Sequence, residues 1–79
     1  RAARGMTPAQ LRASGEALYG ARWYTDLADA LGVAQRTVRR WAAGDNVIPE
    51  GVPAQIRRLL ERRAHAIARI LEDLPTPKL

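Results

Sequence analysis

The stretch YTDLADALGVAQRTVRRWAAG, residues 24–44, decides the fold of this 79-residue chain. Its apolar and small residues recur every three or four positions, the spacing that places side chains on one face of a helix. Gly32 stands between two such groups, where a left-handed residue commonly ends a helix, and Gly44 closes the second group. We therefore expect helices over residues 24–31 and 35–43, joined by a sharp turn.

The second of these helices has two chemically different sides. At about 100° per residue, an apolar stripe on one side is opposed by arginines on or near the other. The apolar stripe consists of Val38, Trp41 and Ala42, and the other side of Arg36, Arg39, Arg40 and Ala43. Two short helices of this kind form a helix-turn-helix, the motif that places its second helix in a DNA major groove.

The segment LADALGVAQRTVRRW resembles the helix-turn-helix of the phage repressor and Cro-like family of small regulators. Hydrophobic residues occupy the family's positions at Leu27, Leu31, Val33, Val38 and Trp41, with Ala28 and Gly32 at its two tightest positions. The chain departs from the family at Ala34, where a Ser or Thr N-cap is common. The resemblance implies a transcriptional regulator of phage or mobile-element type, acting as a repressor in the bacterial cytoplasm, at the nucleoid.

A capping box predicts a further helix before the motif. Thr7 is the expected N-cap, Pro8 the first helical residue and Gln10 the residue that closes the box. This helix covers residues 8–19, with Leu11, Leu18 and Tyr19 among its buried residues. Gly15 within it indicates close approach of another helix, since glycine costs roughly 1 kcal/mol there relative to alanine.

A long helix is expected after the loop at residues 45–53, in which Val47, Ile48 and Val52 should tuck under the domain. Apolar residues then follow a helical stripe over residues 53–74. The stripe contains Ile56, Leu60, Ala64, Ile67, Leu71 and Leu74, flanked by Leu59 and Ile70.

The end of this helix is open to two interpretations. The candidate residues for a homodimer contact are Ile67, Ile70, Leu71 and Leu74. Alternatively, this part folds back on the helix at residues 8–19 of the same chain. In a dimer, the two recognition helices are expected to enter successive major grooves about 34 Å apart on an inverted repeat.

Together these elements predict an all-α protein, a compact four-helix domain that contains the helix-turn-helix and has a long C-terminal helix. The domain covers residues 7–74. Residues 1–6 precede the fold, as a disordered or foreign segment, and residues 75–79 form a flexible tail.

Composition narrows the function classes. The net charge is +5 and the calculated pI is near 11.1, above the value of about 9 typical of nucleic-acid candidates. No cysteine is present, which excludes disulfides and thiolate metal sites. Neither an apolar run long enough for a membrane span nor a signal peptide is evident. With one histidine, His65, and one serine, Ser14, we expect no enzyme, cofactor or small-molecule ligand.

Candidate DNA contacts follow from side-chain chemistry. Arginine can bond guanine O6 and N7 together, and glutamine can bond adenine N6 and N7 in the same way. The candidate base contacts are Gln35, Arg36, Arg40 and Arg39, the last with a phosphate as its alternative. The candidate phosphate contacts are Thr25, Arg22, Thr37 and Asn46. Thr37 could instead touch a thymine methyl.

Several alternatives stay open at this point. Trp23 and Tyr24 could donate to a phosphate or pack in the core. The arginines of the long helix are interpreted as a solvated face. The motif also fits a DNA-binding module of a recombination, packaging or replication protein, and an antitoxin-like domain could use the arginine face on an acidic protein partner.

Overall fold

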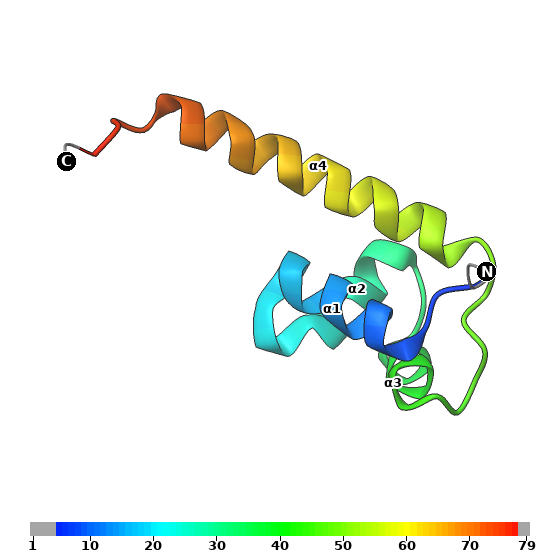
Figure 1. Ribbon diagram of the computed structural model, residues 1–79. Coiled ribbons are helices and arrows are strands. Elements are labelled where there is room, and N and C mark those ends of the chain that lie inside the picture. The colour runs from blue at the N-terminus through cyan, green and yellow to red at the C-terminus, as the bar shows by residue number, and fades with distance from the viewer. Residues whose placement is uncertain (1–4, 78–79) are drawn as a thin grey trace.

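A computed structural model describes residues 5–77 of the chain, and every regular element in that range is a helix (Figure 1). The elements are α1 (Pro8–Tyr19), the short 3₁₀ helix η1 (Gly20–Arg22), α2 (Trp23–Leu31), α3 (Gln35–Ala43) and α4 (Val52–Asp73). No strand occurs among these residues, so the predicted all-α class is confirmed. Each observed α-helix begins and ends within one residue of its predicted boundaries.

Helix α1 begins with the predicted capping box. The Thr7 N–H donates to Oε1 of Gln10 over 3.0 Å, and the Gln10 N–H donates to Oγ1 of Thr7 over 3.1 Å. Pro8 occupies the first turn, where a missing N–H has no consequence. These bonds satisfy N–H groups that the helix cannot pair internally, so the start of α1 is encoded locally.

Gly15 is buried in α1 because the indole of Trp23 lies against its backbone. A Cβ atom at this position would overlap Cε3 and Cδ2 of Trp23. Trp23 is only 2% exposed, so it is a core residue, not a phosphate donor. The predicted close approach at Gly15 is therefore present, and the group that approaches is a side chain from α2.

Two glycines shape the segment from Trp23 to Ala43, which we call the α2–α3 unit. Gly32 ends α2 with φ of 73°, and Gly44 ends α3 with φ of 82°, both in the left-handed region that glycine adopts most readily. The N–H of Val33 donates to the carbonyl of Ala28 over 3.0 Å, which completes the turn after α2. The predicted sharp turn is therefore present.

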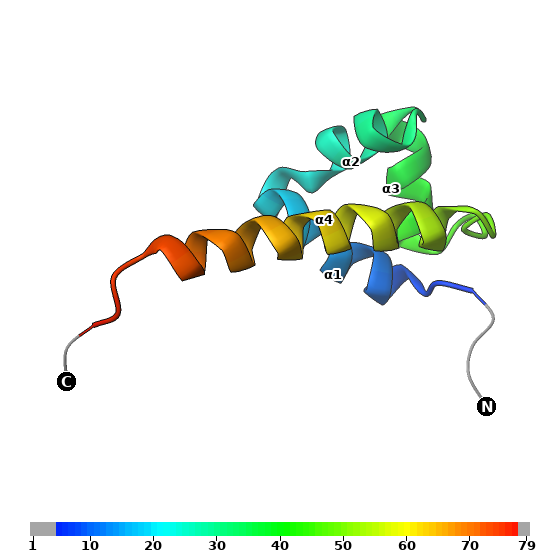
Figure 2. The same ribbon diagram turned by 90° about the horizontal axis from the view of Figure 1, so that it is seen from above.

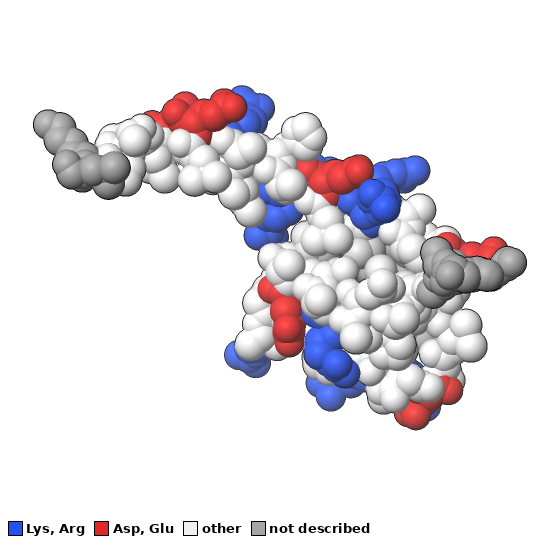
Figure 3. Space-filling view, in the orientation of Figure 1, with Lys and Arg blue, Asp and Glu red and all other residues white. Residues whose placement is uncertain are grey.

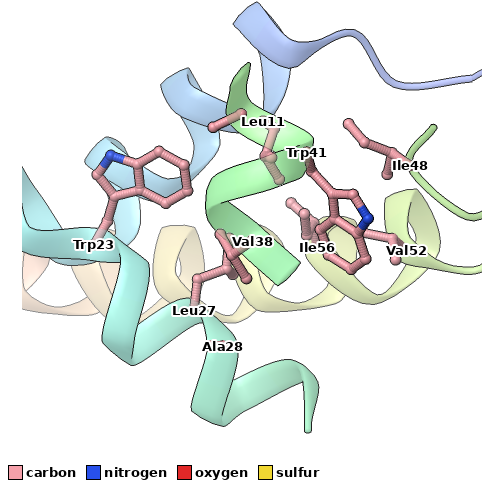
Figure 4. Close-up of a cluster of buried hydrophobic side chains, with 10 residues drawn as sticks. Leu11, Trp23, Leu27, Ala28, Val38, Trp41, Ile48, Val52 and Ile56 are labelled. Carbon is pink, nitrogen blue, oxygen red and sulfur yellow. The ribbon is translucent and has the colours of Figure 1, made fainter. Parts of the chain in front are cut away.

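One apolar core joins the α2–α3 unit to α1, the following loop and the start of α4. In Figure 4 the indole of Trp41 lies beside Ile48, Val52 and Ile56. No polar or charged side chain is buried among the described residues. The buried cluster consists of Leu11, Trp23, Leu27, Ala28, Val38, Trp41, Ala42, Ile48, Val52 and Ile56.

The structure differs from two predictions about the edges of this core. Val47, expected to be buried with Ile48 and Val52, is 89% exposed, because consecutive side chains of this non-helical segment point in different directions and Ile48 takes the core side. Met6, grouped above with the N-terminal segment, is half-buried against the core. Residues 1–4, which belong to the same segment, lie outside the described residues, as do residues 78–79 of the tail.

Helix α4 crosses α1 with its first half and then projects from the body (Figure 1 and Figure 2). Ile56 is fully buried, but every residue from 61 to 77 is exposed. The alternative in which Ile67–Leu74 folds back on α1 is therefore wrong. At roughly 1.5 Å per residue, this 22-residue helix is about 33 Å long, more than the body beneath it covers.

The projecting helix also means that the predicted compactness is not confirmed. The radius of gyration is 15.0 Å, whereas a compact domain of this length has a radius of about 12 Å. The body formed by α1, α2, α3 and the first half of α4 is closely packed, and the extension comes from the second half of α4.

Substitution of Gly15 tests the contact with Trp23. Gly15→Ala should lower the free energy of unfolding by about 1–3 kcal/mol, because overpacking outweighs the better helix propensity of alanine. Chemical denaturation measures this change. Gly51→Ala is the control, since its Cβ would meet no atom within 4 Å and should leave stability unchanged or raise it. A stabilised Gly15→Ala variant would contradict the packing described.

Candidate nucleic-acid interface

Helix α3 has an outer face made mainly of arginine. Its inner side is held in the core, which fixes the rotation of the helix about its axis. The exposed residues are Arg36, Arg39, Arg40 and Ala43, and the buried residues are Val38, Trp41 and Ala42. Arg36 and Arg40 lie one turn apart and farthest from the core, as the periodicity predicts.

Arg39 is held at the edge of this face, beside α2. Its guanidinium carbon lies 5.1 Å from the ring centroid of Tyr24, a cation–π distance. Tyr24 is in turn stacked on Trp23, with ring centroids 4.3 Å apart and an interplanar angle of 22°. The stack connects Arg39 to the core, so this side chain has less freedom than a fully solvated arginine.

The start of α3 has no side-chain cap. Ala34 adopts the extended N-cap conformation, with φ of −72° and ψ of 147°, but it offers no side-chain acceptor. Gln35 and Thr37, both in the first turn, are half-buried. The N–H groups of Thr37 and Val38 donate to the carbonyl of Ala34 over 3.0 and 3.3 Å. The N–H groups of Gln35 and Arg36 precede these bonds and are donors that suit a phosphate oxygen.

The remaining candidate phosphate contacts lie at the two ends of the α2–α3 unit. Arg22 is the N-cap residue of α2, and Thr25 lies in the first turn of α2. Asn46 follows Gly44, beyond the end of α3. All three are exposed, so none of these side chains is held in the core.

The arginines of α3 are not neutralised within the described range. The only ion pair among residues 5–77 joins Arg57 to Glu61 on α4, with 3.9 Å between Nη1 and Oε2. In Figure 3 acidic and basic atoms are interspersed along α4, which fits a solvated face. On α3, in contrast, Arg36 and Arg40 present positive charge without an acidic partner.

The structure also shows a role for Arg12 that no sequence motif indicated. Its Nη2 donates to the carbonyl of Ala42 over 3.2 Å, across 30 residues of sequence. A positive charge near the C-terminal end of α3 is favourable both as a hydrogen-bond donor and toward the helix dipole. Arg12 thus attaches the end of α3 to α1, while the arginines on α3 itself stay exposed.

The serine and the histidine considered for catalysis lie on different helices, α1 and α4. The Ser14 hydroxyl donates to the carbonyl of Gln10 over 2.8 Å, within α1, and His65 is exposed on α4. The described part of the chain contains no cluster of three or more potential metal ligands. In the same range, no helix combines the length and the apolar character needed to cross a membrane.

Comparisons with models of known families, with curated proteins and with solved structures find no match to this chain.

Removal of the Arg12 guanidinium should loosen α3. Arg12→Ala should lower the free energy of unfolding by about 1 kcal/mol, the usual contribution of one hydrogen bond, and the melting temperature by about 4–8 °C. Thermal unfolding followed by circular dichroism measures the shift. Arg58→Ala on α4, which removes an exposed arginine, is the matched control and should leave the midpoint unchanged. Equal midpoints for the two variants would contradict the role of Arg12.

Proposed function

We propose that this protein binds double-stranded DNA in a sequence-specific manner. In this proposal the α2–α3 unit is a helix-turn-helix within a four-helix domain, and α3 is the recognition helix that enters the major groove. The observation that carries the proposal is the exposed, un-neutralised arginine face of α3 on a helix whose other side is buried.

The groove dimensions support this assignment to duplex DNA. The major groove, about 12 Å wide, admits one α-helix, and base edges there present acceptors that arginine can bond. Arg36 and Arg40 point away from the core on successive turns, so both can face the floor of the groove. Helix α4, whose surface carries both acidic and basic side chains, has no comparable concentration of hydrogen-bond donors.

Base and phosphate roles follow from the position of each residue. Arg36 and Arg40 are the proposed guanine contacts, and Gln35, at the first helical position, is the proposed adenine contact. Arg39 lies over Tyr24 at the edge of the face, which favours a phosphate contact. The framing phosphate contacts are Arg22, Thr25, Thr37 and Asn46.

The resemblance to Cro-like regulators extends the proposal to gene regulation. The protein would act as a transcriptional repressor by occupying an operator, in the bacterial cytoplasm at the nucleoid, with an origin in a phage or mobile element. Neither catalysis nor a cofactor enters this function, since DNA occupancy alone excludes other proteins from the site.

Alanine substitutions on α3 test the base contacts. On a duplex recovered by selection, Arg36→Ala and Arg40→Ala should each weaken binding by about 1–3 kcal/mol, or roughly 5- to 150-fold. Each should also relax the preference at one base pair. Fluorescence anisotropy on the selected duplex and on a scrambled duplex measures both effects. Arg58→Ala on α4 is the matched control and should bind like the parent protein.

The same titrations separate the proposal from its alternatives. An equal loss on selected and scrambled duplexes would assign that arginine to the phosphates. Absence of any duplex binding at low salt, together with salt-resistant binding to an acidic protein, would favour the antitoxin-like function. Sequence-specific binding without an effect on a reporter promoter would favour a recombination, packaging or replication module.

A further inference from the structure

A row of stacked side chains runs from the core to the edge of the arginine face of α3. It begins with Trp23, whose indole lies against the backbone of α1 at Gly15. The ring of Tyr24 stacks on this indole, with centroids 4.3 Å apart, and the guanidinium carbon of Arg39 lies 5.1 Å from the centroid of Tyr24. We call Trp23, Tyr24 and Arg39 the stack. It connects an exposed arginine of α3 to a buried residue of α2.

Burial decreases along the stack in the order of its members. Trp23 is 2% exposed, Tyr24 is half-buried against the core, and Arg39 is exposed. Because the indole is enclosed by the core, it gives the ring of Tyr24 a fixed surface to pack on. The orientation of Tyr24 is therefore set from the inside, and Arg39 lies against a ring that is itself held in place.

The contact with Tyr24 leaves the hydrogen-bond donors of Arg39 available. A tyrosine ring attracts a guanidinium through its π electrons and has no carboxylate to occupy the N–H groups. Among residues 5–77 the one ion pair joins Arg57 to Glu61, so Arg39 is not paired with an acid in that range. Arg39 is thus held near α2 while its planar set of donors can still bind an anion.

The direction of Arg39 suits a phosphate at the wall of the major groove. At about 100° per residue, Arg39 lies about 80° around α3 from the midpoint of Arg36 and Arg40. Those two residues face the floor of the groove in the proposed docking, so Arg39 is turned toward one wall, where the DNA backbone runs. Tyr24 holds Arg39 on the side of α2, whose first turn also contains Thr25, another candidate phosphate contact.

We propose that Tyr24 is a positioning residue, which holds Arg39 for contact with a DNA phosphate. This role rests on the proposed function, because it needs a duplex on the outer face of α3. An arginine that is free in solution loses side-chain entropy when it is ordered at an interface, and this loss lowers the affinity. The stack restricts Arg39 before DNA binds, so less entropy is lost on binding.

Two other roles for Tyr24 would give different results on substitution. If the Tyr24 hydroxyl itself bonded a phosphate, Tyr24→Phe would weaken binding as much as Tyr24→Leu. If the ring served only the core, Tyr24→Leu would weaken binding to the same extent with or without Arg39. A positioning role instead requires the ring and not the hydroxyl, and it requires Arg39.

The protein without DNA tests whether the ring holds Arg39. Protons above the face of an aromatic ring are shielded, so in NMR spectra the side-chain protons of Arg39 should lie upfield of those of Arg36 and Arg40. The shift should persist in Tyr24→Phe and disappear in Tyr24→Leu. Ordinary shifts for Arg39 in the parent protein would overturn the proposal, whether or not the protein binds DNA, and this result does not depend on the folding of any variant.

Binding to a duplex of random sequence tests the effect of positioning, because phosphate contacts do not depend on sequence. By fluorescence anisotropy at low salt, Tyr24→Leu should weaken binding about two- to fivefold, the usual size of an exposed cation–π contact, and Tyr24→Phe should bind like the parent. In an Arg39→Ala background, Tyr24→Leu should have no further effect. Arg39→Ala should also reduce the salt dependence of binding by about one phosphate contact.

Tyr19→Leu is the matched control. Tyr19 is also half-buried against the core, but it lies beside Leu59 and Arg63 of α4, so its variant should bind the duplex like the parent. Circular dichroism checks the folding of both leucine variants. Equal losses from Tyr24→Leu with and without Arg39, or a loss with Tyr24→Phe, would overturn the positioning role alone. A parent protein that binds no duplex would contradict the proposed function, and the role of Tyr24 with it.

Discussion

Burial of one side of α3 is the constraint on which the rest of the structure depends. Trp41 is 4% exposed and Val38 is fully buried, and the other residues of the buried cluster come from α1, α2, α3, the loop before α4 and α4 itself. Loss of a buried tryptophan typically costs about 3–5 kcal/mol, against a total stability of about 5–15 kcal/mol for a small domain. Packing of Val38 and Trp41 therefore supplies a large share of the stability of the fold, and the same packing keeps the arginines of α3 on the outside.

The other helices hold α3 while leaving two distant surfaces open. In α1, Gly15 leaves room for the indole of Trp23, and Arg12 donates a hydrogen bond to the carbonyl of Ala42 near the end of α3. The first half of α4 closes the core from the side away from α3, and its second half extends beyond the body (Figure 2). The arginine face of α3 and the exposed second half of α4 thus share no residue, so each can be altered without touching the other.

Local signals explain which features were predictable from the sequence. The capping box at Thr7, the turn at Gly32 and the two sides of α3 depend on neighbouring residues alone. The hydrogen bond from Arg12 to Ala42 depends on a contact between segments that are distant in the sequence. Nothing in the sequence distinguishes Arg12 from the other arginines, so this bond could not be predicted. Periodicity likewise identified the stripe at Ile67 and Leu71 as apolar, but it carries no information on whether the same chain or another covers it. Six of the candidate DNA contacts are exposed, whereas Gln35 and Thr37 are half-buried, and the roles of all eight stay predictions.

Chemical-shift mapping tests most directly whether the outer face of α3 binds DNA. Amide resonances of the labelled protein would be followed during titration with a random-sequence duplex at low salt. We predict the largest changes over residues 35–40, with smaller changes at Arg22, Thr25 and Asn46, and none over residues 57–63 of α4. Changes confined to the arginines of α4, or no change with any duplex, would contradict the assignment of α3 as the recognition helix.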